Sequence, residues 1–111
     1  MRVSQGDIVL LPFPFSNLGE MKVRPALVVS SDEFNRGSGD CLMVPLTSVI
    51  KDGDYSVIIE QADLSSGKLL KNSRIRVDKI FCVEKGLVSM KIGKLGGEVF
   101  GRVRDEIVGM F

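Results

Sequence analysis

The sequence predicts a mainly β fold with a C-terminal α-helix, built as a single domain over residues 1–111. Two observations indicate this fold. Several short apolar or alternating segments follow one another at close spacing, each bounded by turn-forming residues, which is typical of the strands of a small curled barrel or sandwich. From residue 99 onward the apolar residues recur with the period of a helix, so we expect a terminal helix to close the core.

The first strand is predicted at Asp7–Phe13, where apolar and β-branched residues run up to prolines that should end it. Residues Ser16–Val23 contain Ser, Asn and Gly and are predicted to form an exposed loop. The second strand follows at Pro25–Ser30. Arg24 would then lie at the entry of a very apolar strand, held in extended geometry because a proline follows it.

The middle of the chain continues this pattern. Ser31–Asp40 is predicted to form one helical turn with a Ser/Asp cap, followed by a glycine-rich loop. Cys41–Thr47 and Tyr55–Glu60 have the composition of the third and fourth strands. Ala62–Asn72 is predicted to be irregular.

Ser73–Ile80 alternates between apolar and polar residues, which predicts one half-buried strand. Its apolar face would carry Ile75 and Val77, and its polar face Arg74, Arg76 and Asp78. Gly86–Leu95 is predicted as the last strand. A helix starting near Gly97 and Glu98 would follow, with one apolar stripe formed by Val99, Phe100, Val103, Ile107 and Phe111.

The charge of the chain is nearly balanced, with 15 Lys and Arg residues against 14 Asp and Glu residues. This balance argues against a strongly basic nucleic-acid binder. Positive charge is nevertheless concentrated in residues 68–79, where Asp78 is the one acid among Lys68, Lys71, Arg74, Arg76 and Lys79. Such segregation favours a groove for a polyanion on one side of the molecule, although a merely solvated strand face is an equal alternative.

The sequence contains no histidine and two cysteines. We therefore expect no metal site and no cofactor, and any catalysis would depend on Arg, Lys, Thr, Ser, Tyr or carboxylate side chains. Cys41 and Cys82 are predicted to be reduced core thiols of a cytoplasmic protein, with a disulfide left open. Neither a signal peptide nor a membrane span is predicted.

Four segments together resemble the MazF/PemK family of toxins from toxin–antitoxin systems: GDIVLLPFPFSN (6–17), RPALVVSSDEFN (24–35), VPLTS (44–48) and LKNSRIRVDKIFCVEKGLV (70–88). The resemblance covers nearly the whole chain. It implies a strongly bent barrel of the Src-homology-3 type that forms a homodimer. It further implies a metal-independent endoribonuclease that cuts single-stranded RNA and is neutralised by an acidic antitoxin.

The resemblance also assigns residues. The catalytic arginine of the family falls on Arg24 and its catalytic Thr or Ser on Thr47, and the loop that gates the RNA groove falls on Ser16–Val23. This chemistry suits the residue types, because a guanidinium matches the geometry of a phosphate and remains charged at physiological pH. The hydroxyl of Thr47 can orient the 2′-hydroxyl of the RNA, which acts as the nucleophile.

Other residues are candidates for RNA binding. Phe15 and Tyr55 adjoin polar residues and are suited to stack on splayed bases. The full candidate set is Phe15, Ser16, Asn17, Lys22, Ser48, Tyr55, Arg74, Arg76 and Lys79. Asp7 is interpreted mainly as a structural residue, with a role as proton acceptor left open.

Two other functions remain possible at this point. A toxin similar to CcdB would have the same fold but poison gyrase through its C-terminal helix, without an active site. A catalytically silent barrel would only bind nucleic acid or protein. The presence of both Arg24 and Thr47 argues against the CcdB-like alternative.

Overall fold

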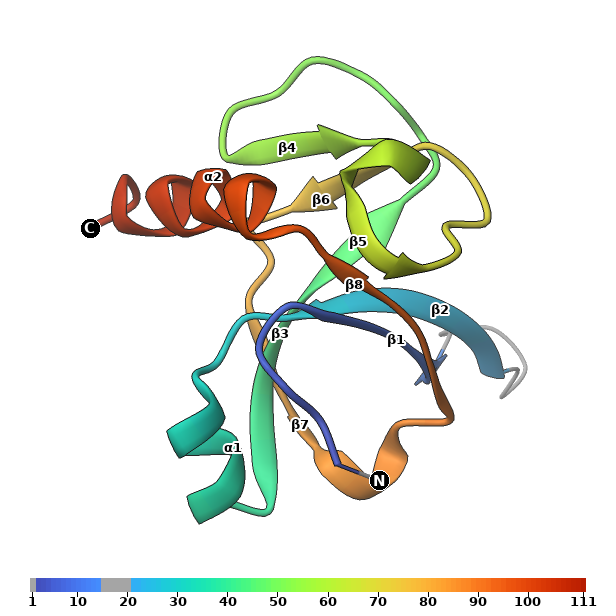
Figure 1. The fold of residues 1–111 in the computed structure, drawn as a ribbon, viewed down its shortest axis with the longest axis vertical. Helices are drawn as coiled ribbons and strands as arrows, with labels where there is room; N and C mark the ends of the chain where they lie inside the picture. The colour runs from blue at the N-terminus through green and yellow to red at the C-terminus, as the bar shows by residue number, and fades with distance from the viewer. Residues whose placement is uncertain (1, 15–20) are drawn as a thin grey trace.

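The computed structural model describes residues 2–14 and 21–111. Within these residues the strands form one antiparallel sheet in the order β4-β6-β3-β2-β1-β8-β5, and β7 pairs with β3 beside this path (Figure 1). The strands are β1 (Asp7–Pro14), β2 (Met21–Val28), β3 (Asp40–Thr47), β4 (Ser56–Ile59), β5 (Leu64–Gly67), β6 (Ser73–Arg76), β7 (Phe81–Glu84) and β8 (Met90–Leu95). The helices are α1 (Asp32–Gly37) and α2 (Gly97–Val108), with 3-10 turns at Gln61–Asp63 and Lys85–Leu87.

The predicted fold class is confirmed, because the sheet is strongly curled and α2 lies against the side formed by β4 and β6 (Figure 1). The central strands are buried on both faces. In β1, for example, Ile8 belongs to the core cluster under α2, whereas Val9 and Leu11 belong to a second cluster that includes Val3 and Val88. Burial on both faces explains why these strands are continuous apolar runs rather than alternating ones.

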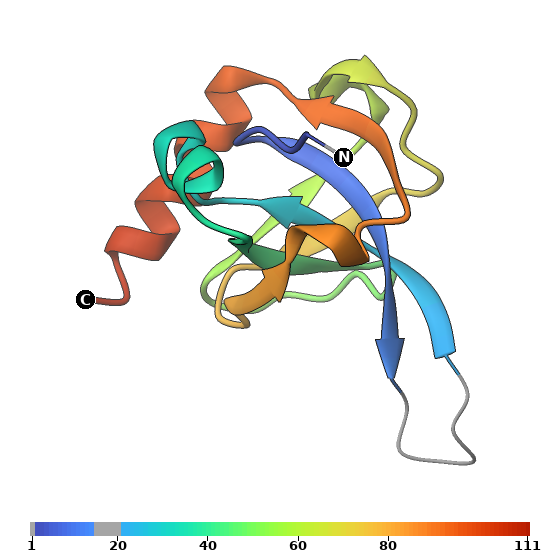
Figure 2. The same cartoon turned by 90° about the horizontal axis from the view of Figure 1, so that it is seen from below.

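The hairpin of β1 and β2 is longer than predicted. Strand β1 continues through Pro12 to Pro14, and β2 begins at Met21, within the segment predicted as a loop. Pro12 is tolerated because β8 pairs with β1 only as far as Leu10, so beyond that residue one side of β1 is a free edge. The ends of both strands project from the body of the molecule (Figure 2).

Arg24 therefore lies inside β2, with Leu11 as its partner across the hairpin, and not at the entry of the strand. The second strand also ends earlier than predicted, at Val28. By contrast, the predicted helical turn is confirmed, since Ser31 caps α1 by accepting a hydrogen bond from the backbone N–H of Phe34 at 3.1 Å.

The segment Ser73–Ile80 is not one strand, as predicted, but contains β6 and the turn that leads to β7. Strand β3 requires both, because its last residues pair with β6 and its first residues with β7. The irregular segment also contains an unpredicted strand, β5. Gly67 lets β5 pack closely on β8: with φ +81°, an added Cβ would lie 2.3 Å from the Cα of Gly93.

Helix α2 covers the core mainly as predicted. Val103 is fully buried, and Val99, Phe100 and Ile107 pack against the same cluster. Phe111 was expected in this stripe but is 96% exposed, because the helix ends at Val108 and the chain then turns away. Gly109, which a stripe extending to Phe111 would place inside the helix, forms its C-cap instead.

The two cysteines lie on adjacent strands but form no disulfide. Cys41 is buried, which confirms its predicted place in the core. Burial raises the pKa of its thiol, so little of the reactive thiolate forms. Cys82 is exposed, which contradicts its predicted place in the core. It pairs with Leu42, one residue along from Cys41, and neighbouring residues of a strand face opposite sides of the sheet. Among the described residues, no helix is long and apolar enough to cross a membrane.

Candidate active site

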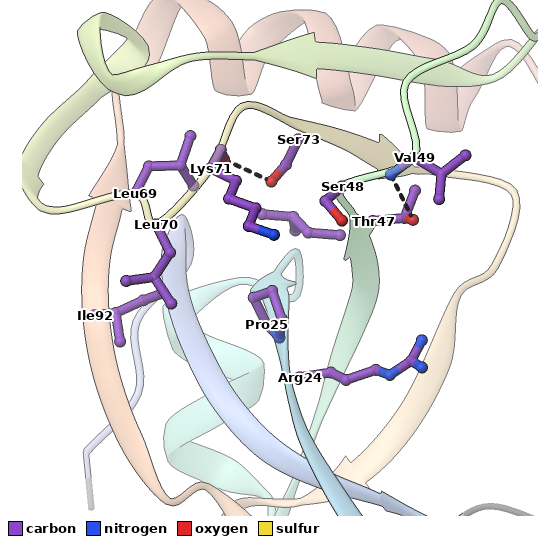
Figure 3. A pocket seen from close by; sticks show the side chains of 11 residues that line it. Arg24, Pro25, Thr47, Ser48, Val49, Leu69, Leu70, Lys71, Ser73 and Ile92 are labelled. Carbon is purple, nitrogen blue, oxygen red and sulfur yellow. Dashed lines mark hydrogen bonds between the residues drawn. The ribbon is translucent and has the colours of Figure 1, made fainter.

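A cavity of about 350 Å³ opens where the middle of β2 and the end of β3 meet the segment that leads into β6 (Figure 3). Strand β2 contributes Arg24 and Pro25, and β8 contributes Ile92. The remaining lining residues come from the end of β3 with the residues after it, and from the segment before and at the start of β6. They are Leu46, Thr47, Ser48, Val49, Leu69, Leu70, Lys71 and Ser73.

The structure brings Arg24 and Thr47, to which the resemblance assigns the catalytic roles, to the same cavity. Strands β2 and β3 pair from Val28↔Met43 to Ala26↔Pro45. Arg24 and Thr47 each lie two residues beyond the last of these pairs, Ala26↔Pro45, and both line the cavity. Both side chains therefore belong to sheet strands and not to a free loop. The backbone positions from which they extend are held by the sheet.

Thr47 is the last residue of β3 and is half-buried. Its Oγ1 accepts a hydrogen bond from the backbone N–H of Val49 at 3.1 Å (Figure 3). Because a hydroxyl also carries a proton, this contact leaves it able to donate to a ligand in the cavity. The arrangement gives one permanent cation and one hydroxyl donor on the wall of a single cavity.

The rest of this wall was not predicted from the sequence. Leu69, Leu70 and Ile92 form an apolar side, while Lys71 and Ser73 add polar groups. The Oγ of Ser73 donates to the carbonyl oxygen of Lys71 at 2.9 Å, which fixes the turn before β6. The one available signal was the cationic segment 68–79, which includes Lys71 and was noted for its charge. A cavity with an apolar side and few polar groups is the usual form of a small-ligand site.

The other predicted RNA-binding residues do not line this cavity, apart from Ser48. Lys22, Tyr55 and Lys79 are exposed elsewhere on the surface, and Arg74 is buried. Phe15, Ser16 and Asn17 lie outside the described residues, as does most of the predicted gating loop.

Arg76 is engaged by a neighbouring acid. Its Nε and Nη2 donate to the two carboxylate oxygens of Asp78, each at 3.1 Å. These hydrogen bonds lower the pKa of the Asp78 carboxyl. Asp78 therefore stays ionised and offsets part of the charge that Arg76 would present to a polyanion.

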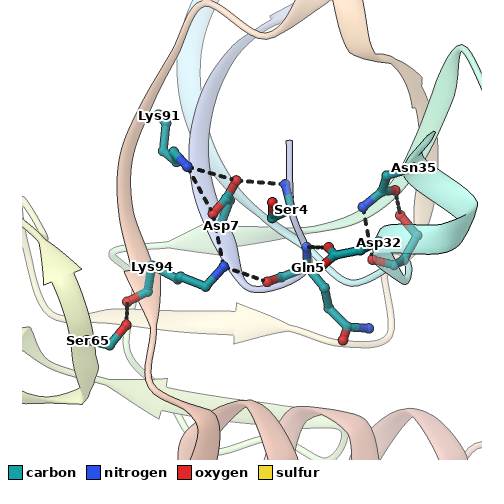
Figure 4. Close-up of polar contacts among 9 residues, drawn as sticks. Ser4, Gln5, Asp7, Asp32, Asn35, Ser65, Lys91 and Lys94 are labelled. Carbon is teal, nitrogen blue, oxygen red and sulfur yellow. Dashed lines mark hydrogen bonds and ion pairs between the residues drawn. The ribbon is translucent and has the colours of Figure 1, made fainter. Parts of the chain in front are cut away.

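Asp7 occupies a separate polar network (Figure 4). Its carboxylate is fully buried and accepts a hydrogen bond from the backbone N–H of Ser4 at 2.8 Å. The Nζ atoms of Lys91 and Lys94 lie 3.3 and 3.6 Å from its oxygens. The network ties the N-terminal residues and β1 to β8, which agrees with the structural interpretation of Asp7.

Replacing Asp7 with alanine should lower the free energy of unfolding by about 2–3 kcal/mol, because the backbone N–H of Ser4 and two lysines lose a charged partner. Urea unfolding followed by circular dichroism measures this change. Glu84→Ala, at an exposed site on β7, is the control and should change stability by less than about 0.5 kcal/mol. Equal stabilities of the two variants would contradict the structural role.

Comparison with known proteins adds to this geometry. The family model described as "PemK-like, MazF-like toxin of type II toxin-antitoxin system" matches residues 4–111. A search of curated proteins finds no match.

Solved structures share the fold at low sequence identity. A MazE–MazF crystal structure from Deinococcus radiodurans has a TM-score of 0.81 at 19% identity, with 99% of this chain and 96% of that chain covered. An endoribonuclease in complex with its cognate antitoxin from a mycobacterial species has a TM-score of 0.77 at 18% identity, with coverage of 96% and 92%. The Mycobacterium tuberculosis toxin MazF-mt6 has a TM-score of 0.70 at 16% identity, with coverage of 91% and 93%.

Proposed function

We propose, since the chain belongs to the family of PemK-like, MazF-like toxins of type II toxin–antitoxin systems, that it is a toxin that cleaves single-stranded RNA inside the strand. The observation that carries this proposal is the meeting of Arg24 and Thr47 on adjacent strands in one cavity. The names of similar structures, an endoribonuclease among them, agree with it.

The proposed reaction uses a group of the substrate as the nucleophile. The 2′-oxygen of the RNA attacks the adjacent phosphorus, and the bond from phosphorus to the 5′-oxygen breaks. The 2′-hydroxyl loses its proton and the leaving oxygen gains one. The products are a 2′,3′-cyclic phosphate and a 5′-hydroxyl end, and no metal or cofactor takes part.

Arg24 and Thr47 have different tasks in this reaction. Negative charge grows on the phosphoryl oxygens in the transition state, and the guanidinium of Arg24 stabilises it by charged hydrogen bonds. Because Arg24 projects from a paired strand, little reorganisation is needed when this charge develops. The hydroxyl of Thr47 orients the 2′-hydroxyl or a phosphoryl oxygen.

The remaining parts of the proposal concern binding. RNA would bind beside the cavity through Phe15, Ser16, Asn17, Lys22, Ser48, Tyr55, Arg74, Arg76 and Lys79. The toxin would act in the cytoplasm as a homodimer, and an acidic antitoxin would neutralise it by covering the same cationic surface. Support comes from the family, whose description names a toxin–antitoxin system.

Cleavage of a defined single-stranded RNA should persist in excess EDTA, because the proposed chemistry needs only side chains and the RNA. Sequencing and end-group analysis of the fragments should find 2′,3′-cyclic phosphate and 5′-hydroxyl ends. A strict requirement for magnesium or zinc would contradict the proposal. Absence of any cleavage by a folded protein would favour a gyrase poison or a binding barrel without activity.

A further inference from the structure

Arg74, in the middle of β6, is only 5% exposed to solvent. Its Nε has no hydrogen-bond partner, and within residues 2–14 and 21–111 its guanidinium forms no ion pair. An arginine keeps its charge at every physiological pH, so Arg74 cannot avoid this situation by losing a proton. In the described part of the chain Arg74 is thus a buried residue with an unbonded Nε and no ion-pair partner, which is unfavourable for folding.

The register of β6 determines on which face of the sheet the guanidinium of Arg74 lies. Its neighbour Ile75 points into the core cluster under α2, so Arg74 points to the opposite, outer face of the sheet. The cross-strand partners of Arg74 are Thr47 on β3 and Ile58 on β4. Directly paired residues lie on the same face of a sheet, so Arg74 and Thr47 are neighbours on the outer face.

The loop of residues 48–55 between β3 and β4, which we call the β3–β4 loop, passes close to the guanidinium of Arg74 at Gly53. An added Cβ on Gly53 of this loop would lie 3.0 Å from Nη1 of Arg74. The backbone at Gly53 therefore lies directly over the guanidinium. The loop contains acids, but none of them forms an ion pair with Arg74.

The β3–β4 loop ends in an unfavourable backbone conformation. Tyr55 has a φ of +56°, and it is the one residue other than glycine with a positive φ in the described part of the chain. Such conformations persist only where the surrounding structure holds them. Here the carbonyl oxygen of Tyr55 accepts a hydrogen bond from the backbone N–H of Val77 at 3.0 Å.

Arg74 lies next to one member of the candidate catalytic pair. It pairs directly with Thr47 between β6 and β3, and Thr47 lines the same cavity as Arg24. Neighbouring strands are about 4.8 Å apart, so the side chain of Arg74 starts one strand away from the hydroxyl of Thr47.

We propose that Arg74 binds a second phosphate of the RNA, next to the phosphate at which cleavage occurs, and that the β3–β4 loop covers Arg74 until RNA displaces it. The inference rests on the proposed function, because it takes Arg24 and Thr47 as the point of cleavage. A phosphate would supply the negative charge that the buried guanidinium lacks, and the planar guanidinium can bind it through two parallel hydrogen bonds.

The binding test uses Arg74→Met, which keeps most of the side-chain volume but removes the charge. Its matched control is Arg36→Met, which removes one charge from the exposed surface of α1. The ligand is a fluorescent oligonucleotide of a cleaved sequence with 2′-fluoro groups at every position, so that it cannot react. Fluorescence anisotropy at several salt concentrations gives the affinity and its dependence on salt.

Arg74→Met should weaken RNA binding about 10-fold or more, whereas Arg36→Met should weaken it less than about 2-fold. Loss of one phosphate contact should also lower the slope of log K against log salt by about 0.7. Thermal unfolding separates this role from a structural one. Arg74→Met should raise the melting temperature of the free protein by about 4 °C, because an unpaired buried charge is gone.

The movement of the β3–β4 loop can be followed in the unmodified sequence. The chain has one tyrosine, so incorporation of 3-fluorotyrosine gives a single fluorine NMR signal at Tyr55. The 2′-fluoro oligonucleotide is replaced here by its 2′-O-methyl form, which carries no fluorine. RNA should shift this signal in the wild-type chain, and Arg74→Lys, which retains the charge, should show the same shift at weaker affinity.

The outcomes distinguish this inference from the proposed function. If the wild-type chain binds no RNA, both fail. If it binds RNA but Arg74→Met binds as tightly as Arg36→Met, only the second phosphate site is wrong. The inference is also wrong if Arg74→Met melts at a lower temperature with unchanged RNA affinity, or if it weakens binding of an aspartate-rich peptide and not of RNA. Should Arg74→Met fail to fold, an unmoved Tyr55 signal in RNA-saturated wild-type protein overturns the proposed displacement.

Discussion

Replacing Arg24 with alanine should lower the rate of RNA cleavage about 10²–10³-fold, the loss typical for one fixed donor that stabilises charge in a transition state. Arg24 comes from β2 and lines the same cavity as Thr47, and the sequence contains no histidine that could substitute for it. Single-turnover cleavage of a labelled RNA measures the effect. The affinity for an uncleavable RNA should fall much less than the rate.

One further variant shows whether the geometry or only the charge of Arg24 matters, and a second serves as a surface control. Arg24→Lys should recover a small part of the lost rate, because a lysine provides a point charge without the planar pair of donors. Arg36→Ala, on the exposed surface of α1, should cleave at the wild-type rate. Normal cleavage by a folded Arg24→Ala variant would overturn the catalytic assignment.

Thr47 is expected to act together with Arg24 rather than independently. Thr47→Val removes the hydroxyl but keeps the branched shape of the side chain in β3. If both groups stabilise one transition state, the double variant should lose less activity than the product of the two single losses. Independent losses that simply multiply would indicate that the two residues act at separate steps.

The sequence was informative where a local physical rule determines the structure. Ser31 caps α1 because a side-chain oxygen can satisfy a free N–H at the start of any helix, whatever the tertiary fold. The apolar runs of β1 and β3 and the stripe of α2 were predictable for the same reason. The cavity position of Arg24 and Thr47 followed from the resemblance to a family and agrees with the register of β2 and β3.

Other features depended on contacts between distant residues. Strand β5 has the polar sequence LSSG and becomes a strand because Gly67 can approach the backbone of Gly93 on β8. The chain is divided into β6 and β7 because the two strands pair with different halves of β3. The last residues of β3 pair with β6, and its first residues pair with β7. No local pattern in Ser73–Ile80 contains that information.

Arg74 is the clearest example of this limit. Its alternating pattern predicted an exposed polar face, either the wall of a groove for a polyanion or a solvated surface. Arg74 is buried instead, and Gly53 of the β3–β4 loop lies close to its guanidinium. A rule of local sequence that is broken without a compensating contact often marks a functional site, and Arg74 is such a residue.

Replacing the 2′-hydroxyl at the cleaved nucleotide with hydrogen should reduce cleavage below detection, because the proposed nucleophile is then absent. The deoxy substitution leaves every phosphate and every base in place. Since phosphate contacts and stacking supply most of the affinity for single strands, binding should remain within about 3-fold of the all-RNA strand. Gel analysis of cleavage and anisotropy of binding, with the same oligonucleotide, measure the two effects separately.

The control for this substitution is an oligonucleotide with the deoxy nucleotide two positions away from the cleaved bond, which should be cut normally. Together the two oligonucleotides distinguish the loss of the nucleophile from a general inability of the protein to cleave RNA that contains deoxyribose. Equal cleavage of the all-RNA strand and the strand with the deoxy nucleotide at the cleaved position would rule out attack by the 2′-oxygen. A water molecule would then have to be the nucleophile, and the products would be linear phosphates, so Arg24 and Thr47 would serve a different reaction in the same cavity.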